Sequence, residues 1–162
     1  MLIGIHWATS MSEVPLKERI TEDTKTAMRA RDSRRVGALR LVNSEIKRLE
    51  VDERRVVSDS EVVTILERML KQRADSYRQF LDAGRTDLSD QEAFEIELIR
   101  QYMPTALSDD ELNHAIALAV AEVGATSGKE MGAVMALLKT RVAGRADMKA
   151  VSALVKQALS GS

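Results

Sequence analysis

Apolar residues recur along most of this chain at intervals of three and four positions, the spacing of one face of an α-helix. The clearest runs are Val36, Leu39, Val42, Ile46 and Leu49; Val63, Leu66, Leu70, Tyr77 and Leu81; and Leu112, Ile116, Ala119 and Val123. No comparable run alternates with a period of two, the spacing of a β-strand. The pattern therefore predicts an all-α protein.

Capping signals indicate where the predicted helices begin and end. A Ser-x-x-Glu motif, in which serine and glutamate satisfy free N–H groups of the first turn, occurs at Ser58–Glu61, Ser89–Glu92 and Ser108–Glu111. Glycine enters at little cost the left-handed conformation that ends many helices, and it follows helical patterns at Gly84, Gly124 and Gly144. Together these signals predict seven helices, over residues 16–31, 33–52, 59–83, 89–103, 109–123, 129–142 and 147–159.

Pro104 is the clearest break in the helical pattern, because proline lacks an amide hydrogen and disfavours helix at the preceding residue. We place a domain boundary there. Because short connections favour antiparallel neighbours, residues 16–103 are predicted to form a four-helix N-terminal bundle and residues 104–162 a small three-helix domain. We interpret residues 1–15 as a disordered or misassigned start, with Met1 and Met11 both open as the first residue of the protein.

Composition narrows the chemistry that the chain can perform. Its 162 residues include no cysteine, which excludes disulfides, thiolate metal sites and cysteine nucleophiles. No apolar run reaches the roughly 20 residues needed to cross a bilayer. We therefore expect a soluble, cytosolic protein with no membrane partner.

Charge is unevenly distributed along the chain, although the net charge is only −1. Residues 17–55 hold 12 Lys and Arg against 8 Asp and Glu, residues 59–123 hold 6 against 14, and residues 124–162 hold 6 against 2. Two basic segments thus flank an acidic one. This arrangement permits an anionic partner on one face, and it equally fits solvated helix faces without a partner.

A basic turn near the C-terminus is the strongest candidate site. Gly144 can end the sixth helix and Asp147 can cap the seventh, which makes a helix–turn–helix shape. Four cationic residues surround this turn: Lys139, Arg141, Arg145 and Lys149. Because a helix N-terminus itself attracts anions, the pattern favours contacts with phosphate.

Other kinds of site find little support in the sequence. There is no Walker-type phosphate loop, and the closest glycine pair, Gly128 and Gly132, falls in a predicted helix, where we expect it to permit close packing. Glu111 and His114 have the Glu-x-x-His spacing of di-iron bundles, but no second such motif accompanies them. We therefore predict no catalytic residue, no metal and no cofactor.

Several segments of the chain resemble the GatB/YqeY family, in its order and spacing. They are LRLVNSEIK (Leu39–Lys47), LKQRADSYRQFLDAGRTDL (Leu70–Leu88), EIELIRQYMPTALSDDEL (Glu95–Leu112) and GKEMGAVMALLKTRVAGRADMKAVSALVK (Gly128–Lys156). Family members often have proline where Thr140 stands and glycine where Met148 stands. The missing glycine puts in doubt any role that requires a close backbone approach at this turn.

The resemblance implies a stand-alone relative of the B subunit of the glutamine-dependent aspartyl/glutamyl-tRNA amidotransferase, whose tail shares the three-helix domain. In that enzyme the catalytic chemistry lies in other domains and subunits, and the shared tail helps to engage tRNA. The family's usual label, carbon–nitrogen ligase activity with glutamine as amide donor, is inherited from the full enzyme.

Three functions stay open at this point. The first is a tRNA-binding accessory module that uses the basic turn, with tRNA, amidotransferase or aminoacyl-tRNA synthetase components as partners. Further contacts for this module are expected on the N-terminal bundle, at Arg40, Lys47, Lys71 and Arg73. The second function is a helical protein-interaction adaptor without nucleic-acid binding. The third, an autonomous amide-transfer enzyme, has the least support because no catalytic constellation is visible.

Overall fold

The computed structural model describes residues 14–142 and 144–161, and the all-α prediction is confirmed for them. These residues form seven α-helices and one short 3-10 helix, and no strand occurs among them. They fall into two compact units, one ending at Tyr102 and the other beginning at Met103. The hypothesis about residues 1–15 concerns a stretch that lies almost wholly outside the described residues.

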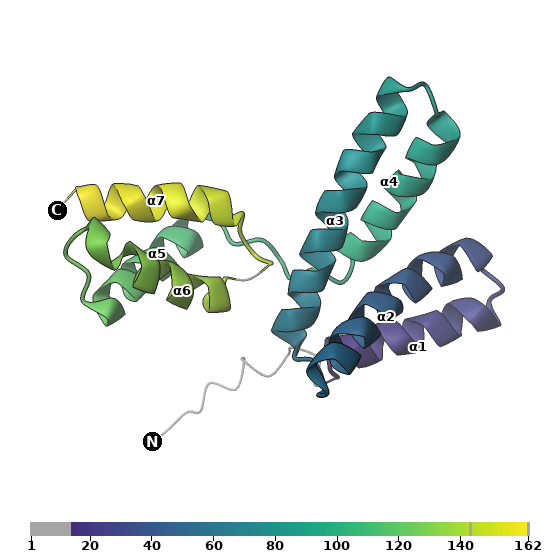
Figure 1. The fold of residues 1–162 in the computed structure, drawn as a ribbon, viewed down its shortest axis with the longest axis horizontal. Coiled ribbons are helices and arrows are strands. Elements are labelled where there is room, and N and C mark those ends of the chain that lie inside the picture. The colour runs from purple at the N-terminus through teal and green to yellow at the C-terminus, as the bar shows by residue number, and fades with distance from the viewer. Residues whose placement is uncertain (1–13, 143, 162) are drawn as a thin grey trace, which may run out of the picture. The chain divides into compact units, whose positions relative to one another are not determined.

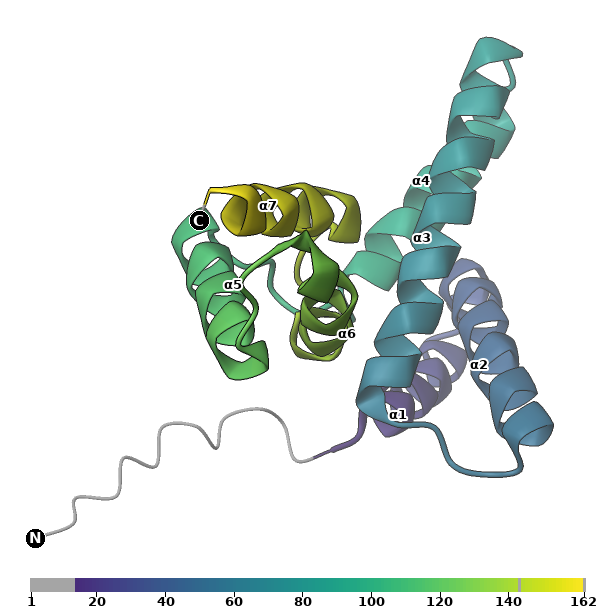
Figure 2. The same cartoon turned by 60° about the vertical axis from the view of Figure 1, so that its left-hand side comes forward.

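The first unit consists of two antiparallel helical hairpins (Figure 1). Its helices are α1 (Leu16–Arg29), α2 (Ser33–Glu53), α3 (Asp59–Asp82) and α4 (Thr86–Arg100). Helix α1 packs mainly on α2, and α3 packs mainly on α4. The two hairpins meet at the start of α3 and diverge toward their tips (Figure 2). The predicted single bundle of four helices is therefore not confirmed.

The apolar core of this unit lies where the hairpins meet. The most deeply buried large side chains come from all four helices: Ile20, Leu39, Ile46, Leu66 and Ile99. All the buried residues of α3 fall between Val62 and Met69, in the first half of that helix. Beyond Met69 no residue of α3 is buried, and α2 contacts the far half of α4 through Arg34, which donates to Gln91 and to the Asp90 carbonyl.

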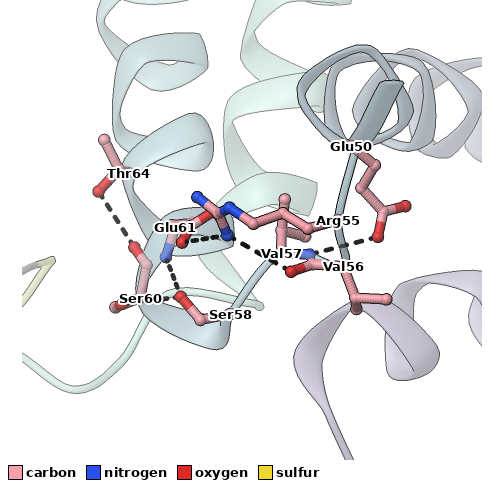
Figure 3. A network of polar contacts seen from close by, with 8 residues as sticks. All are labelled: Glu50, Arg55, Val56, Val57, Ser58, Ser60, Glu61 and Thr64. Carbon is pink, nitrogen blue, oxygen red and sulfur yellow. Dashed lines mark hydrogen bonds and ion pairs between the residues drawn. The ribbon is translucent and has the colours of Figure 1, made fainter. Parts of the chain in front are cut away.

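The connection between α2 and α3 is held by a polar network (Figure 3). Arg54 ends α2 in the left-handed conformation, with φ of 52°. The Glu50 carboxylate accepts hydrogen bonds from Lys17 of α1 and from the backbone N–H of Val57. One acidic side chain thus fixes α1, α2 and the segment that leads into α3.

The predicted capping motif at the start of α3 forms only in part. The Ser58 hydroxyl accepts a hydrogen bond from the backbone N–H of Glu61, as expected. The Glu61 carboxylate does not complete the motif, because it pairs with Arg55 at 2.9 Å. Serine therefore caps this helix while glutamate joins the network of the connection (Figure 3).

Helix α4 begins three residues earlier than predicted, and its capping motif at Ser89–Glu92 is wrong. Ser89 is buried inside the helix, and its hydroxyl donates to the carbonyl of Thr86. Gly84, with φ of 69°, reverses the chain directly after α3. Because the connection between α3 and α4 is so short, the first helical turn of α4 precedes Ser89.

The second unit contains α5 (Asp109–Val123), the 3-10 helix η2 (Gly128–Glu130), α6 (Met131–Arg141) and α7 (Met148–Ser160). Ser108 caps α5 and Gly124 ends it, as predicted. The α5–α7 core is formed by fully buried side chains, namely Ala119, Val134, Leu138, Val151 and Val155. The complete capping box of this unit joins Ser127 and Glu130, a pair that the sequence analysis passed over.

The expected close packing around Gly128 and Gly132 is absent. A Cβ atom added at either position would meet no described atom within 4 Å. Gly128 instead begins η2, and Gly132 lies exposed in α6.

We expect replacement of Leu39 by alanine to destabilise the first unit by about 2–5 kcal/mol, because it leaves a cavity in the core. Leu39 has 0% of its surface exposed. Leu41, two positions away on α2, is 47% exposed, so Leu41→Ala should change stability by no more than about 0.5 kcal/mol. The free energy of unfolding in urea measures both, and equal effects would contradict the assignment of the core.

Glu50 should make the stability of the first unit depend on pH. The hydrogen bond from Lys17 lowers the pKa of the Glu50 carboxyl, with a further contribution from the N–H of Val57. Because the pKa of this carboxyl is lower in the folded state, its charge stabilises the fold at pH values above the unfolded-state pKa of about 4.3. This stabilisation is lost as the pH falls through the folded-state pKa.

We therefore expect Glu50→Gln to lower the free energy of unfolding near neutral pH, and the difference from the parent protein to narrow below about pH 4.3. Glu18→Gln, at an exposed position of α1, is the matched control. Urea unfolding across this pH range measures both variants. A difference for Glu50→Gln that stays constant with pH would contradict the role of its charge.

Candidate functional site

The four cationic residues of the predicted basic turn divide into two kinds. Lys139, at the end of α6, and Lys149, at the start of α7, are exposed and form no ion pair within the described residues. Arg141 pairs with Glu122 of α5. Arg145 is only partly exposed. Two of the four side chains are thus available to a partner without breaking a contact.

Arg145 holds the second unit together. Its Nε atom donates to the carbonyl oxygen of Thr105 at 2.9 Å, and its own carbonyl accepts from the N–H of Leu107 at 2.8 Å. Its guanidinium also lies 3.8 Å from the Glu111 carboxylate. Arg145 therefore ties the segment before α5 to the turn before α7.

The second unit as a whole is electrically balanced. From residue 103 onward it carries six Lys and Arg and six Asp and Glu. The acidic partners of Arg141 and Arg145 both come from α5, a helix that belongs to the acidic segment of the sequence. Folding therefore brings together charges that are separated along the chain, and the turn is less basic than the sequence indicates.

Arg73, one of the tRNA contacts expected on the first unit, is already paired with an acidic side chain of the protein. Its Nε atom donates to the Glu95 carboxylate of α4 at 2.6 Å, and the two side chains are only 14% and 11% exposed. A partner could reach this guanidinium only by leaving a buried carboxylate unpaired. The structure thus removes Arg73 from the candidate surface, while Lys71 is exposed on α3.

Arg40 and Lys47 lie together on a groove between α1 and α2, which we call the hairpin groove. On α2 they share one helical face with Asn43, because the three residues are spaced by three and four positions. The groove contains two hollows. One, of about 420 Å³, is lined by Met28, Arg31, Ser33, Val36, Gly37 and Arg40. The other, of about 320 Å³, is lined by Lys17, Thr21, Thr24, Lys25, Asn43, Ile46, Lys47 and Glu50.

The hairpin groove carries an excess of positive charge. Lys17 and Lys25 are compensated by Glu50 and Glu22, respectively. Three further cations of the groove form no ion pair within the described part of the chain: Arg31, Arg40 and Lys47.

The charges of the two hairpins are opposite. Residues 17–55, which form the α1–α2 hairpin, hold 12 Lys and Arg against 8 Asp and Glu, whereas residues 59–102 hold 6 against 10. The α1–α2 hairpin, which carries the hairpin groove, is therefore the cationic half of the first unit.

Sequence reasoning named Arg40 and Lys47 but missed the groove. Its lining comes from two helices and from the turn that joins them, where Arg31 is left-handed with φ of 57°. No glycine marks this turn, so its left-handed conformation was not predictable from the residue types. A signal was available in the polar residues that recur at helical spacing on both helices, Thr21 and Thr24 on α1 and Asn43 on α2.

Other candidate features of the sequence can be placed among the described residues. No group of three or more metal-binding side chains occurs among them. Glu111 faces Arg145, and His114 is exposed on α5. None of the described helices is long and apolar enough to cross a membrane. What the groove can do is contact phosphate or another anion.

Comparison with known families matches residues 17–159 to the Yqey-like protein family. The chain belongs to this family. Three relatives of the YqeY-like chain are named "Altered inheritance of mitochondria protein 41, mitochondrial". The protein from Pyrenophora tritici-repentis is 26% identical over 139 residues, which cover 83% of this chain and 77% of the relative.

The other two relatives are from yeasts. The Clavispora lusitaniae protein is 33% identical over 69% of this chain and 67% of its own length. The Lachancea thermotolerans protein is 32% identical, and the match covers 63% of this chain and 55% of the relative. The YqeY-like chain thus spans from about half to three quarters of these proteins.

The names of these relatives overturn the predicted cytosolic location. The prediction rested on the lack of cysteine, which reports on redox environment and does not distinguish among reducing compartments. The fungal relatives of the YqeY-like chain are named as mitochondrial proteins.

We expect Arg145→Ala to lower the stability of the second unit by about 1–3 kcal/mol, because it removes a charge-assisted hydrogen bond to the Thr105 carbonyl. Lys149→Ala is the matched control, since its exposed side chain should contribute less than about 0.5 kcal/mol. Thermal unfolding followed by circular dichroism measures both. Equal midpoints for the two variants would show that Arg145 is not structural.

Proposed function

We propose that this YqeY-like protein is an accessory module that binds tRNA through its phosphate backbone, with the hairpin groove as the main contact surface. The observation that carries the proposal is the presence of Arg31 and Arg40 beside one hollow of the groove and of Lys47 beside the other, with no ion pair from these three side chains within the described residues. Neutralising phosphates with such side chains releases counterions, which supplies much of the affinity of proteins for nucleic acids.

The lining of the groove favours contacts with the backbone of a folded RNA over contacts with unpaired bases. Single-stranded RNA is commonly bound by bases that stack on aromatic side chains. The aromatic residues of the described chain all lie outside α1 and α2: Tyr77, Phe80, Phe94 and Tyr102. The groove instead offers cationic side chains, which suit phosphate oxygens, whereas the hydroxyls of Thr21 and Thr24 donate to carbonyls of α1 and the Asn43 amide donates to Thr24.

Lys139 and Lys149 of the second unit provide an additional contact in this proposal. Both are exposed and unpaired within the described residues. Arg141 and Arg145 have supporting roles, because their guanidinium groups pair with α5. The chemistry of amide transfer, which the family label carries, is assigned to a partner enzyme, since the described residues form no catalytic constellation.

We expect Arg40→Glu with Lys47→Glu to weaken tRNA binding at least about tenfold and to reduce the salt dependence of log K by about 0.7–0.9 for each lost phosphate contact. Fluorescence titration of labelled bulk tRNA at low and near-physiological salt measures both quantities. A double-stranded RNA of similar charge serves as the competitor.

Lys129→Glu with Lys156→Glu is the matched control, because it makes the same change of charge at exposed positions outside the groove. An equal loss of affinity in the two double variants would show that the groove has no special role. Unchanged affinity in Arg40→Glu with Lys47→Glu would remove the groove from the proposal. No binding by the parent protein would favour a protein-interaction adaptor instead.

A further inference from the structure

One side of the α3–α4 hairpin has an apolar face that no other helix of the first unit covers. A hollow of about 450 Å³ runs along it from the second half of α3 to the last turns of α4, and its apolar lining is formed by Ala74 and Tyr77 of α3 and by Ala93 and Ile96 of α4. Leu81, one helical turn beyond Tyr77, is 46% exposed and extends the same stripe. Helices normally bury such a stripe against another element.

No helix of the first unit covers this face. The buried residues of α3 end at Met69, before the stripe begins. Both views show the tips of the two hairpins pointing apart (Figures 1 and 2). Two helices alone cannot enclose a core. The apolar face of the α3–α4 hairpin therefore lacks a third helix from the first unit.

The rim of the hollow carries both signs of charge. Arg78 pairs with the exposed Asp75 at 2.7 Å. Glu97 and Arg100 lie one turn apart on α4 and form no ion pair within the described residues. A partner with one dominant charge would match only part of this rim. In a contact between two copies related by a twofold axis, residue i of one copy meets residue j of the other and the reverse pair forms as well, so the unpaired Glu97 and Arg100 of one copy can meet Arg100 and Glu97 of the other.

We propose that the α3–α4 faces of two copies pack against each other to form a homodimer. Tyr77 and Ile96 lie at the centre of the contact, and the two hairpins complete a four-helix arrangement across the twofold axis. Arg100 of each copy meets Glu97 of the other. The proposal does not depend on RNA binding, since it concerns a hairpin other than the one that carries the hairpin groove.

Sedimentation velocity of the full-length chain over a range of concentrations tests the proposal. The parent protein should sediment as a dimer that dissociates on dilution. Ile96→Glu should weaken the dimer by at least about tenfold, because it places an unpaired charge in the apolar centre. Leu118→Glu is the matched control: this side chain of α5 is 49% exposed and lies outside the face, so the variant should keep the parent's dimer. Circular dichroism checks that both variants remain helical.

A charge exchange makes the test independent of any loss of packing. Arg100→Glu should weaken the dimer by facing Glu97 with a like charge, and Glu97→Arg should do the same by facing Arg100. The double exchange should restore the dimer at least in part, because the opposite charges meet again. A parent protein that is monomeric at all concentrations would overturn the proposal. So would a dimer that persists unchanged in Ile96→Glu and in Arg100→Glu.

Discussion

The first unit depends on one small apolar core, placed where its two hairpins meet. Leu39 and Ile46 of α2, Leu66 of α3 and Ile99 of α4 are almost completely buried there, together with Ile20 of α1. Burial of one such side chain contributes roughly 1.5–3 kcal/mol. Because each helix turns only one face toward this core, the outer faces of both hairpins are left for polar side chains.

Around this core, polar contacts join the two hairpins and engage several charged side chains. Arg34 of α2 donates to the Gln91 side chain, which donates in turn to the Glu95 carboxylate, and Arg73 donates to the other oxygen of that carboxylate. Arg34 also lies over the ring of Phe94, 4.2 Å from its centre. These contacts explain why some cations of α2 and α3 are structural while Arg40 and Lys47 are free.

Helical periodicity was sufficient to predict the fold class and most helices, and the bounds of α5 agree with the predicted span. It failed at α4, where a tight turn after Gly84 made Ser89 an internal residue and not a cap. Periodicity identifies which face of a helix is buried but not what that face meets. The single bundle was therefore expected where two diverging hairpins occur.

The sequence allowed individual residues of the candidate site to be predicted, but not their arrangement. The cations of the C-terminal turn were visible in the sequence, but two of their acidic partners lie on α5, and pairing over such a separation follows from the fold alone. Likewise, Arg40 and Lys47 share a helix face that spacing reveals. The α1 side of the groove and the left-handed conformation of Arg31 depend on the turn that joins α1 to α2.

The opposite charges of the two hairpins have a consequence for the speed of association. Residues 17–55 carry four more cationic than acidic side chains, and residues 59–102 carry four more acidic than cationic ones, so the unit has a charge dipole and almost no net charge. At physiological salt the field of each hairpin decays within about 8 Å. A distant polyanion is then not drawn in by long-range attraction. It is oriented only on close approach, with the cationic α1–α2 hairpin turned toward it, so the two hairpins act on the last few ångströms of the encounter.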